Sequence, residues 1–456
     1  MPVGTFQQSM HPWYTSASAE RFETEAQTKE SPMAAPISRR TVLAAGAAAA
    51  GLSLPGVAAY AGGHPSRSVR FTLNARVLDG GEQVTSITLD TDRLGPIDPD
   101  SLTTDTFSVH AKATSPIPVA AGDQIFSEYD LDRPVTDVRL DRRGNIVIQL
   151  RYAEGQVGGG TLGYILSKGR NVQLDLVYTI TQNAPITLRN RRPVTIRRFE
   201  QGRLSNPEVD AFSYRVSDSG MNYRLYSPNR GGGHRGRRRG RPLIVWLHGG
   251  GEGGLLADDY YDNETPLRAN RGALGFATPR AQRIFDGAYV VAPQSTSYWM
   301  EDGPRFAPLI REIIGDLARR YPIDRDRIYV VGASNGGYMT MEMTNIYRDL
   351  FAAAVPICGV VQPLRPGGPR LLTDAELRQI RTPTWLVTSR NDPTVPAEPN
   401  TILAHRLIPD SLLTLYDRVV WNGHEYDDHW SWIYVARNDP SINGTHIWQW
   451  MADQRR

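Results

Sequence analysis

Cysteine is almost absent from this chain of 456 residues, which contains only Cys358. No intramolecular disulfide can therefore form, and the stability of the fold must come from packing. Because Cys358 lies in the apolar segment VPICG at 355–359, we interpret it as a buried small residue in preference to a reactive thiol.

Lysine is also scarce, occurring only at positions 29, 112 and 168, and arginine supplies almost all of the positive charge. The formal net charge is only +3, which does not indicate a nucleic-acid partner. A Gly/Arg run at 230–241 could suggest RNA binding, but no aromatic residues are interleaved within it. We interpret this run as a solvated loop and expect no nucleic-acid partner.

The sequence lacks clusters of Cys and His at metal-ligand spacing, and the acidic segment DDYYD at 258–262 is more typical of a surface or cleft loop than of a cation site. We therefore expect neither a metal ion nor an organic cofactor. No internal repeat is visible, which argues against a propeller.

Long hydrophobic runs are missing except for one weakly hydrophobic, Ala/Gly-rich segment at 42–61. The segment SRRTVL at 38–43 precedes it, and together they resemble a twin-arginine signal peptide, although Val42 and Ala44 depart from the usual pattern. We predict a leader at 1–61, cleaved before Gly62, and a secreted protein with no stable membrane insertion. The alternatives are an uncleaved membrane anchor and, for the start of translation, Met33.

Short alternating segments separated by Gly, Asp and Pro fill the region that follows the leader. Alternation of period two with frequent turn residues predicts an antiparallel all-β sandwich of immunoglobulin-like type over 62–188, with its last strand at 172–180. We expect an Arg- and Pro-rich linker at 189–208.

The pattern changes in the remaining region, 209–456. A hairpin at 212–226 is followed by apolar strands near 243–247, 288–292, 328–331 and 384–387, with helical spacing at 306–321. Strands that alternate with helices predict a mostly parallel sheet covered by helices on both faces.

One of these strands leads into the segment GASNGG at 332–337, which contains the pattern G-x-S-x-G. The bare pattern is weak, but a strand before it and a helix after it are the context of the nucleophile in the α/β-hydrolase fold. Small residues allow strand and helix to approach, so the turn exposes the hydroxyl of Ser334. The alternative is an ordinary Gly-rich start of a helix.

A second glycine-rich loop, HGGGE at 248–252, follows another buried strand. This is where the fold places one donor of an oxyanion hole, and we predict the amide of Gly249 or Gly250 for that role. The second predicted donor is the amide of Asn335, beside the nucleophile at the start of a helix. A phosphate-binding loop is less consistent, because no Lys-Ser/Thr continuation follows.

A serine nucleophile requires a base and a carboxylate that orients the base. We predict Asp392 as this carboxylate, because it directly follows a strand that ends near residue 388, although a simple turn aspartate would also fit. His424 and His429 both have the right chain order for the base, and they remain alternatives on this ground alone.

Taken together, LHGGGEGG at 247–254, VAPQ at 291–294, GASNGG at 332–337 and HWSWIY at 429–434 resemble bacterial secreted esterases. In these proteins an immunoglobulin-like domain precedes a prolyl-oligopeptidase-like hydrolase domain. The resemblance favours His429 over His424 and implies a triad of Ser334, Asp392 and His429. It also implies that Trp299 lines the substrate site, although a core or interdomain aromatic residue is an equally good interpretation.

The predicted function is therefore cleavage of a small-molecule or polymer-linked carboxylic ester by an exported serine hydrolase. A serine peptidase of prolyl-oligopeptidase type is one alternative, and an inert secreted carbohydrate- or surface-binding protein is another. The sequence is compatible with both a monomer and an oligomer.

Overall fold

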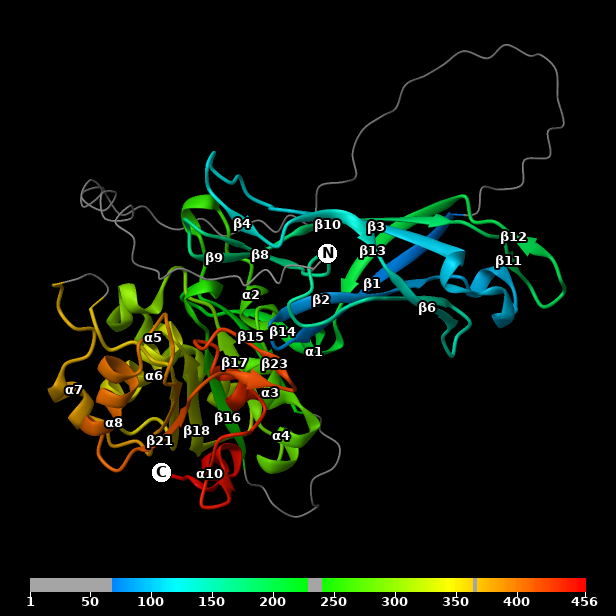
Figure 1. Cartoon of the computed structure of the whole chain (residues 1–456). Helices are drawn as coiled ribbons and strands as arrows, with labels where there is room; N and C mark the ends of the chain where they lie inside the picture. Colours follow the sequence, from blue (N-terminus) through cyan, green and yellow to red (C-terminus); the bar gives the residue numbers. More distant parts are fainter. Residues whose placement is uncertain (1–67, 229–239, 364–366) are drawn as a thin grey trace, which may run out of the picture. The chain divides into compact units, whose positions relative to one another are not determined.

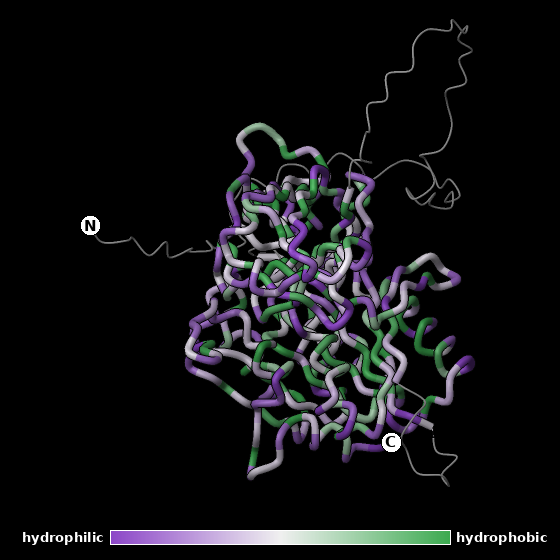
Figure 2. The backbone as a smooth tube through the Cα atoms, turned by 90° about the vertical axis from the view of Figure 1, so that its right-hand side faces the viewer, coloured by the Kyte–Doolittle hydropathy of each residue, from purple (hydrophilic) through white to green (hydrophobic). Residues whose placement is uncertain are grey.

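The structure, a computed structural model, describes residues 68–228, 240–363 and 367–456 (Figure 1). The predicted leader and almost all of the Gly/Arg run lie outside these residues. Within them, no helix combines the length and the apolar character that crossing a membrane requires. The tube in Figure 2 shows correspondingly short hydrophobic stretches that alternate with hydrophilic ones.

The N-terminal half of the described chain is rich in strands. A five-stranded sheet has the order β13 (Arg198–Ser205), β1 (Ser68–Leu78), β2 (Gly81–Leu89), β7 (Ile146–Leu150), β6 (Val135–Leu140). Two three-stranded sheets have the orders β10 (Asp175–Gln182), β3 (Phe107–Thr114), β5 (Tyr129–Arg133) and β4 (Ile125–Phe126), β8 (Leu162–Ile165), β9 (Arg170–Gln173). The short strands β11 (Ile186–Thr187) and β12 (Pro193–Val194) pair with each other.

Alternating burial explains how two of these sheets share one core. Every second residue of β3 is buried, and β1 shows the same alternation over most of its length. Buried residues from both sheets, such as Phe71, Ile87, Val109 and Ile180, form a single hydrophobic cluster. The region therefore forms a β-sandwich, while its immunoglobulin-like type stays a prediction.

The expected linker at 189–208 is wrong in part, because it contains strand β13. This strand pairs in parallel with β1, from Ser68 beside Arg198 to Asn74 beside Ser205. Its residues are exposed or half-buried, as is common for the edge of a sheet, so the sequence shows no clear period of two. The sheet is consequently not purely antiparallel.

The C-terminal half contains an eight-stranded sheet, and here the sequence prediction of a mostly parallel α/β sheet is confirmed. Only β15 runs antiparallel to its two neighbours within the described residues. The strand order is β14 (Phe212–Val216), β15 (Asn222–Tyr226), β17 (Tyr289–Pro293), β16 (Arg241–Leu247), β18 (Ile323–Ala333), β19 (Ala353–Ile357), β20 (Trp385–Ser389), β21 (Leu412–Tyr416).

Helices cover both faces of this sheet because its central strands are apolar on both sides. On β16, Leu243 and Val245 belong to the cluster that contains helices α5 and α6, whereas Ile244 and Trp246 pack with α3, α4 and α10. The helices are α1 (Pro207–Asp210), α2 (Thr265–Arg268), α3 (Gly272–Ala277), α4 (Pro279–Ile284), α5 (Gly303–Arg320), α6 (Asn335–Ile346), α7 (Asp374–Gln379), α8 (Leu403–Leu407), α9 (Trp432–Ala436) and α10 (Ile447–Asp453).

The topology brings three chain positions to one edge of the sheet. Strands β18, β19 and β20 are adjacent and parallel, so their carboxyl ends lie side by side. Ser334 follows β18, Cys358 follows β19, and Asp392 lies three residues beyond β20. Ligands and catalytic residues of open α/β sheets gather at this edge.

Candidate active site

Ser334 occupies a strained turn between β18 and α6. Its backbone angles are φ 57° and ψ −115°, a conformation that residues with a side chain rarely adopt. The turn is fixed on both sides, because the Ser334 amide donates to the carbonyl of Ile357 at 2.8 Å and its carbonyl accepts from the Tyr338 amide at 3.0 Å. Such strain is typical of a nucleophile exposed above the sheet.

Gly332 and Gly336, two residues before and after Ser334, lie where neighbouring backbone comes too close for a side chain. A Cβ on Gly332 would collide with the backbone of Gly336, and a Cβ on Gly336 would collide with the carbonyl of Leu247 at the end of β16. The helix can therefore sit directly against two strands only because these positions lack side chains.

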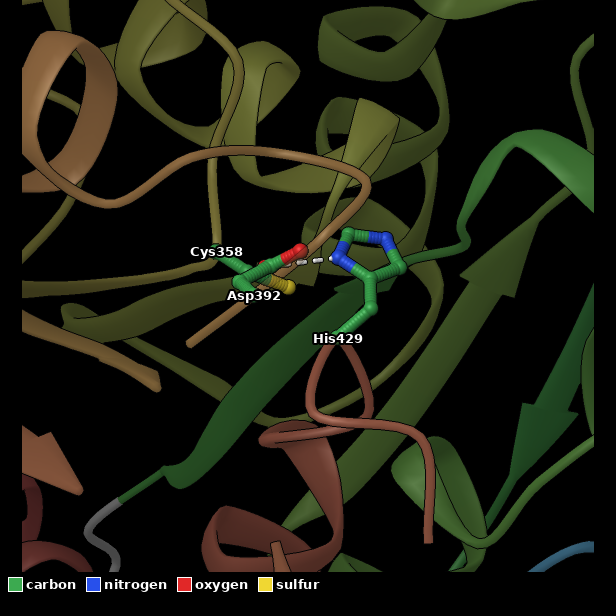
Figure 3. A group of neighbouring side chains, drawn as sticks. All are labelled: Cys358, Asp392 and His429. Carbon is green, nitrogen blue, oxygen red and sulfur yellow. Dashed lines mark hydrogen bonds and ion pairs between the residues drawn. The ribbon is translucent and has the colours of Figure 1, made fainter. Parts of the chain in front are cut away.

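Asp392 and His429 form a buried pair (Figure 3). His429 Nδ1 and Asp392 Oδ2 lie 2.8 Å apart. The other carboxylate oxygen, Oδ1, accepts from the amides of Thr394 at 2.9 Å and Val395 at 2.7 Å. The carboxylate is thus held in place by its own loop, and it can fix the tautomer and orientation of the imidazole.

The structure distinguishes between the two candidate histidines, His424 and His429. His424 lies in the small hairpin of β22 (Val420–Trp421) and β23 (His424–Glu425), and its ring packs against Tyr426 with a centroid distance of 4.5 Å. The structure shows it as half-buried, whereas only 8% of His429 is exposed. The loop 427–431 therefore brings His429 to the predicted carboxylate.

Charges close to His429 shift its titration. The pKa of the imidazole lies well above its usual value: burial opposes the charged ring, but the Cys358 sulfur and the Asp392 carboxylate together favour it more strongly. An imidazolium is thus stabilised in this position, which is what a base needs after it has accepted a proton.

Cys358 is the residue whose position the sequence did not reveal. It is fully buried, as expected, but its sulfur and the ligand atoms of Asp392 and His429 all lie within 4.8 Å of one another (Figure 3). This is the one group in the described part of the chain whose side chains could hold a metal ion, and two of its members already bond each other. The signal was available, because Cys358 directly follows a strand of the active-site edge.

His248 fixes the backbone of the loop that follows β16. This residue is fully buried, and burial lowers the pKa of its ring to about 3. Because Nε2 accepts from the Ser295 amide at 3.0 Å, Nδ1 carries the proton and donates to the Gly249 carbonyl at 2.7 Å. A neutral histidine thereby fixes the backbone of the predicted oxyanion loop.

Gln294, the last residue of the VAPQ segment, helps to hold the same loop in place through hydrogen bonds. Its side-chain amide donates to the Glu252 carbonyl at 2.9 Å and to Asp262 Oδ1 at 3.0 Å, while its side-chain oxygen accepts from the Asn263 amide at 2.7 Å. The last residue of the glycine-rich loop and the segment 262–263 are therefore anchored to the end of the neighbouring strand β17. This preorganises the backbone, as transition-state stabilisation requires.

The prediction that Trp299 lines the substrate site is corrected by the structure. Its side chain is fully buried, and its indole N–H donates to the His248 carbonyl at 3.1 Å. The ring packs between His248 and Phe306, with centroid distances of 4.8 Å and 5.2 Å. Trp299 is therefore a core aromatic residue that supports the loop, the alternative that the sequence left open.

The amides predicted as oxyanion donors lie at the starts of helical turns. Asn335 is the first residue of α6, where backbone N–H groups have no partner within the helix, and its side-chain oxygen accepts from the Met300 amide at 2.9 Å. Gly249 and Gly250 begin the short 3-10 turn Gly250–Glu252. The Ala333 carbonyl lies 3.8 Å from where a Cβ on Gly249 would be, so this loop is next to the nucleophile turn.

Comparisons with known proteins agree with this geometry. Residues 312–367, which include Ser334, match the prolyl oligopeptidase family. A crystal structure of a thermostable esterase superposes with a TM-score of 0.66 at 26% identity, covering 85% of this chain and 99% of that chain. The chain is therefore similar in fold to an esterase of the α/β-hydrolase type.

This α/β-hydrolase also matches parts of two curated proteins. The candidate esterase NocK of Nocardia uniformis subsp. tsuyamanensis is 27% identical over 134 residues, 28% of this chain and 37% of that protein. Poly(3-hydroxyalkanoate) depolymerase C of Paucimonas lemoignei is 36% identical over 84 residues, 16% of this chain and 20% of that protein. The matches span well under half of either relative's length.

The likeness to the thermostable esterase is not limited to the α/β sheet. The predicted catalytic region 209–456 is only about half of the chain, whereas the superposition covers 85% of it. The chain therefore shares part of its strand-rich N-terminal half with that esterase as well.

Proposed function

We propose that the protein is an exported serine esterase that cleaves carboxylic esters through an acyl-enzyme on Ser334. The observations that carry the proposal are the buried hydrogen bond between His429 and Asp392 and the strained conformation of Ser334, since Ser334 and Asp392 follow strands that end at the same edge of the sheet. This combination supplies a nucleophile, a base and an orienting carboxylate in the chain order of α/β-hydrolases. The thermostable esterase with the same fold over most of the chain supports ester chemistry.

In the proposed reaction, Ser334 Oγ attacks the ester carbonyl while His429 accepts its proton. The amides of Asn335 and of Gly249 or Gly250 stabilise the oxyanion, and Asp392 stabilises the imidazolium. His429 then protonates the departing alcohol, which leaves an acyl-enzyme. Water that gives its proton to His429 attacks this acyl group, and release of the acid returns the proton to Ser334.

The proposed substrates are small or polymer-linked carboxylic esters. Partial similarity to a poly(3-hydroxyalkanoate) depolymerase supports polymer-linked esters. Partial similarity to the candidate esterase NocK supports ester hydrolysis in general. The prolyl oligopeptidase match makes amide cleavage the second function to test, since the same triad can cleave both bonds.

The deciding experiment is hydrolysis of a short- to long-chain p-nitrophenyl ester series by the mature protein. Ser334→Ala and His429→Ala should each lower kcat by on the order of 10⁶-fold, whereas His424→Ala should stay within a few-fold of the parent. Labelling by a fluorophosphonate should require Ser334. Peptide cleavage without ester cleavage, or binding without turnover, would overturn the proposal.

Export by the twin-arginine route is part of this proposal and is supported by the SRR segment at 38–40 and the small-residue run after it. Peptide mapping of the secreted protein should find Gly62 at the mature N-terminus. Retention in the cell with an intact leader would contradict export.

A further inference from the structure

Glu252 presents a buried oxygen without a partner to the active-site loop. Only 8% of the residue is exposed, and its Oε2 has no hydrogen-bond partner among the described residues. Its other oxygen, Oε1, accepts one long contact of 3.5 Å from Asn171 Nδ2. A buried carboxyl oxygen of this kind costs free energy unless another group bonds it.

The free oxygen faces the oxyanion loop. A Cβ placed on Gly249 would lie 3.0 Å from Glu252 Oε2. It would also lie 3.8 Å from the carbonyl oxygen of Ala333, the residue before the nucleophile. The charge of His429 also favours the ionised form of Glu252.

Arg170, on strand β9 of the N-terminal half, approaches the same loop through the ring of Tyr298. It is 3% exposed, its Nε has no partner among the described residues, and its Nη1 donates to the Gly169 carbonyl at 3.1 Å. The guanidinium carbon of Arg170 lies 3.3 Å from the centroid of the Tyr298 ring. A Cβ placed on Gly250 would lie 3.1 Å from the same ring.

Arg170 and Glu252 are opposite charges that influence each other without forming an ion pair. Arg170 favours the ionised form of Glu252 through its charge, yet no ion pair joins the two side chains in the described structure. Two buried polar groups that stay apart are stabilised when a third polar group bonds to both. A hydroxyl group can do so, because it donates one hydrogen bond and accepts others.

We propose that Glu252 and Arg170 form a subsite that recognises a hydroxyl group carried by the ester substrate close to the scissile bond. The hydroxyl donates to Glu252 Oε2 and accepts from Arg170 Nε. The inference rests on the proposed function and adds to it the class of substrate, hydroxylated esters. An ester with only methylene groups at this place leaves both side chains unpaired, which the site rejects.

The protonation of Glu252 is compatible with this role. Burial raises the pKa of its carboxyl to about 7, while the charges of Arg170 and His429 favour the ionised form. In either protonation state Oε2 can bond a hydroxyl, because a carboxylic acid donates and a carboxylate accepts. Recognition of the hydroxyl therefore does not depend on a single pH.

A second buried glutamate provides a matched control. Glu342 on α6 is also buried, and burial also raises the pKa of its carboxyl to about 7, with the charge of Glu376 as the second cause. Its side chain interacts with Asn345. Glu342→Gln thus tests the loss of a buried carboxyl of similar titration away from the subsite.

The test compares the kcat/KM of the mature protein for pairs of matched esters. One pair is p-nitrophenyl 3-hydroxybutyrate with p-nitrophenyl butyrate, and the other is 2-hydroxyethyl butyrate with ethyl butyrate. We expect a preference of about ten- to a hundred-fold for the hydroxylated member of one pair, the size expected for a hydrogen bond to a charged group. The pair that shows it identifies the acyl or the alcohol side.

Substitutions then assign the preference. Glu252→Leu and Arg170→Met should bring the ratio close to one, Glu252→Gln should keep part of it, and Glu342→Gln should keep all of it. Because the readout is a ratio, a general loss of rate does not imitate the effect. A ratio near one in the parent protein for both pairs, or a ratio that Glu252→Leu leaves intact, overturns the inference.

The same experiment separates this inference from the proposed function. A protein that hydrolyses the esters and is labelled at Ser334, but shows no preference in either pair, refutes the subsite alone. A protein that hydrolyses no ester refutes the esterase. Where the variants do not fold, the ratios of the parent protein still decide.

Discussion

The ionisation of His429 depends on two neighbouring side chains at the active-site edge. His429 is buried against Asp392 and next to Cys358, and these neighbours set the pKa of the imidazole well above the usual value. The base of an esterase must be neutral before it accepts the proton of Ser334. The environment that stabilises the imidazolium therefore also determines the pH at which the enzyme begins to work.

The pH dependence of ester hydrolysis should report this shift. We expect kcat/KM to fall as the pH decreases through an apparent pKa above about 6.5, the usual value for histidine, because protonated His429 cannot act as a base. Asp392→Asn removes the neighbouring charge, so it should move this midpoint to lower pH and lower the rate by about 10⁴-fold. A pH profile from about 4 to 9 with p-nitrophenyl butyrate as substrate measures both the midpoint and the rate.

His424→Ala is the control for this profile, since His424 lies in a different hairpin and should leave the midpoint unchanged. A midpoint at or below the usual histidine value in the parent protein would contradict the shift. So would a midpoint that Asp392→Asn does not move.

The turn between β18 and α6 shows how a single element stores strain for function. Ser334 has a positive φ of 57° and a ψ of −115°, which glycine tolerates far better than serine. The hydrogen bonds of the turn to Ile357 and Tyr338 keep the residue in this conformation. The fold therefore holds the nucleophile against its intrinsic preference.

Replacing Ser334 by glycine should relieve this strain while it abolishes hydrolysis. We expect Ser334→Gly to exceed Ser334→Ala in free energy of unfolding by about 1 kcal/mol, because alanine keeps the strained conformation and glycine relieves it. Urea unfolding of both inactive variants measures the difference. Equal stabilities, or a less stable glycine variant, would show that the turn carries no such strain.

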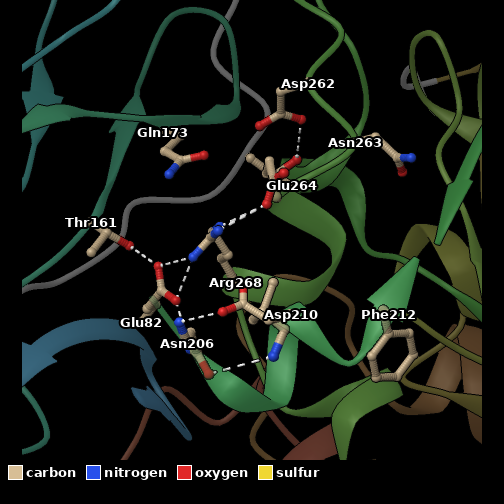
Figure 4. A network of polar contacts seen from close by, with 12 residues as sticks. Glu82, Thr161, Gln173, Asn206, Asp210, Phe212, Asp262, Asn263, Glu264 and Arg268 are labelled. Atoms are coloured by element: carbon tan, nitrogen blue, oxygen red, sulfur yellow. Dashed lines mark hydrogen bonds and ion pairs between the residues drawn. The ribbon is translucent and has the colours of Figure 1, made fainter. Parts of the chain in front are cut away.

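Charged groups connect the two halves of the molecule. Glu82 on β2 accepts from Arg268 on α2 at 2.5 Å and 2.6 Å, and also from Thr161 Oγ1 at 2.7 Å and Asn206 Nδ2 at 2.6 Å (Figure 4). The Glu82 side chain is fully buried and that of Arg268 is 8% exposed. Glu264 bonds the other side of the guanidinium, so the buried charges are fully paired.

Removal of the Glu82 charge should strongly destabilise the protein. Glu82→Gln leaves the buried Arg268 without a full counter-charge, and breaking a buried pair on one side typically costs about 3–5 kcal/mol. Chemical denaturation at neutral pH measures the loss. The control Asp130→Asn disrupts an exposed pair with Lys112, so it should change the stability little. Similar effects of the two variants would contradict a structural role for the network.

Much of the fold was predictable because its signals are local. Alternation of apolar residues in strands and helical spacing at 306–321 predicted the parallel sheet and helix α5, and the hairpin of β14 and β15 followed from its own pattern. Strand β13 was missed, since an exposed edge strand rich in arginine has no apolar face to display. The twin-arginine leader stays a prediction, because it lies outside the described residues.

The sequence by itself determined where the strands end, and therefore that Ser334 and Asp392 lie at one edge of the sheet. Only the tertiary structure decided that His429 and not His424 bonds Asp392, that Trp299 lies beneath the loop, and that Cys358 lies beside the pair. It also brought Arg170 and Glu252 to the same loop from two halves of the chain. The physical reason is that periodicity and turn chemistry act over a few residues, whereas contacts between distant side chains depend on how the finished elements pack.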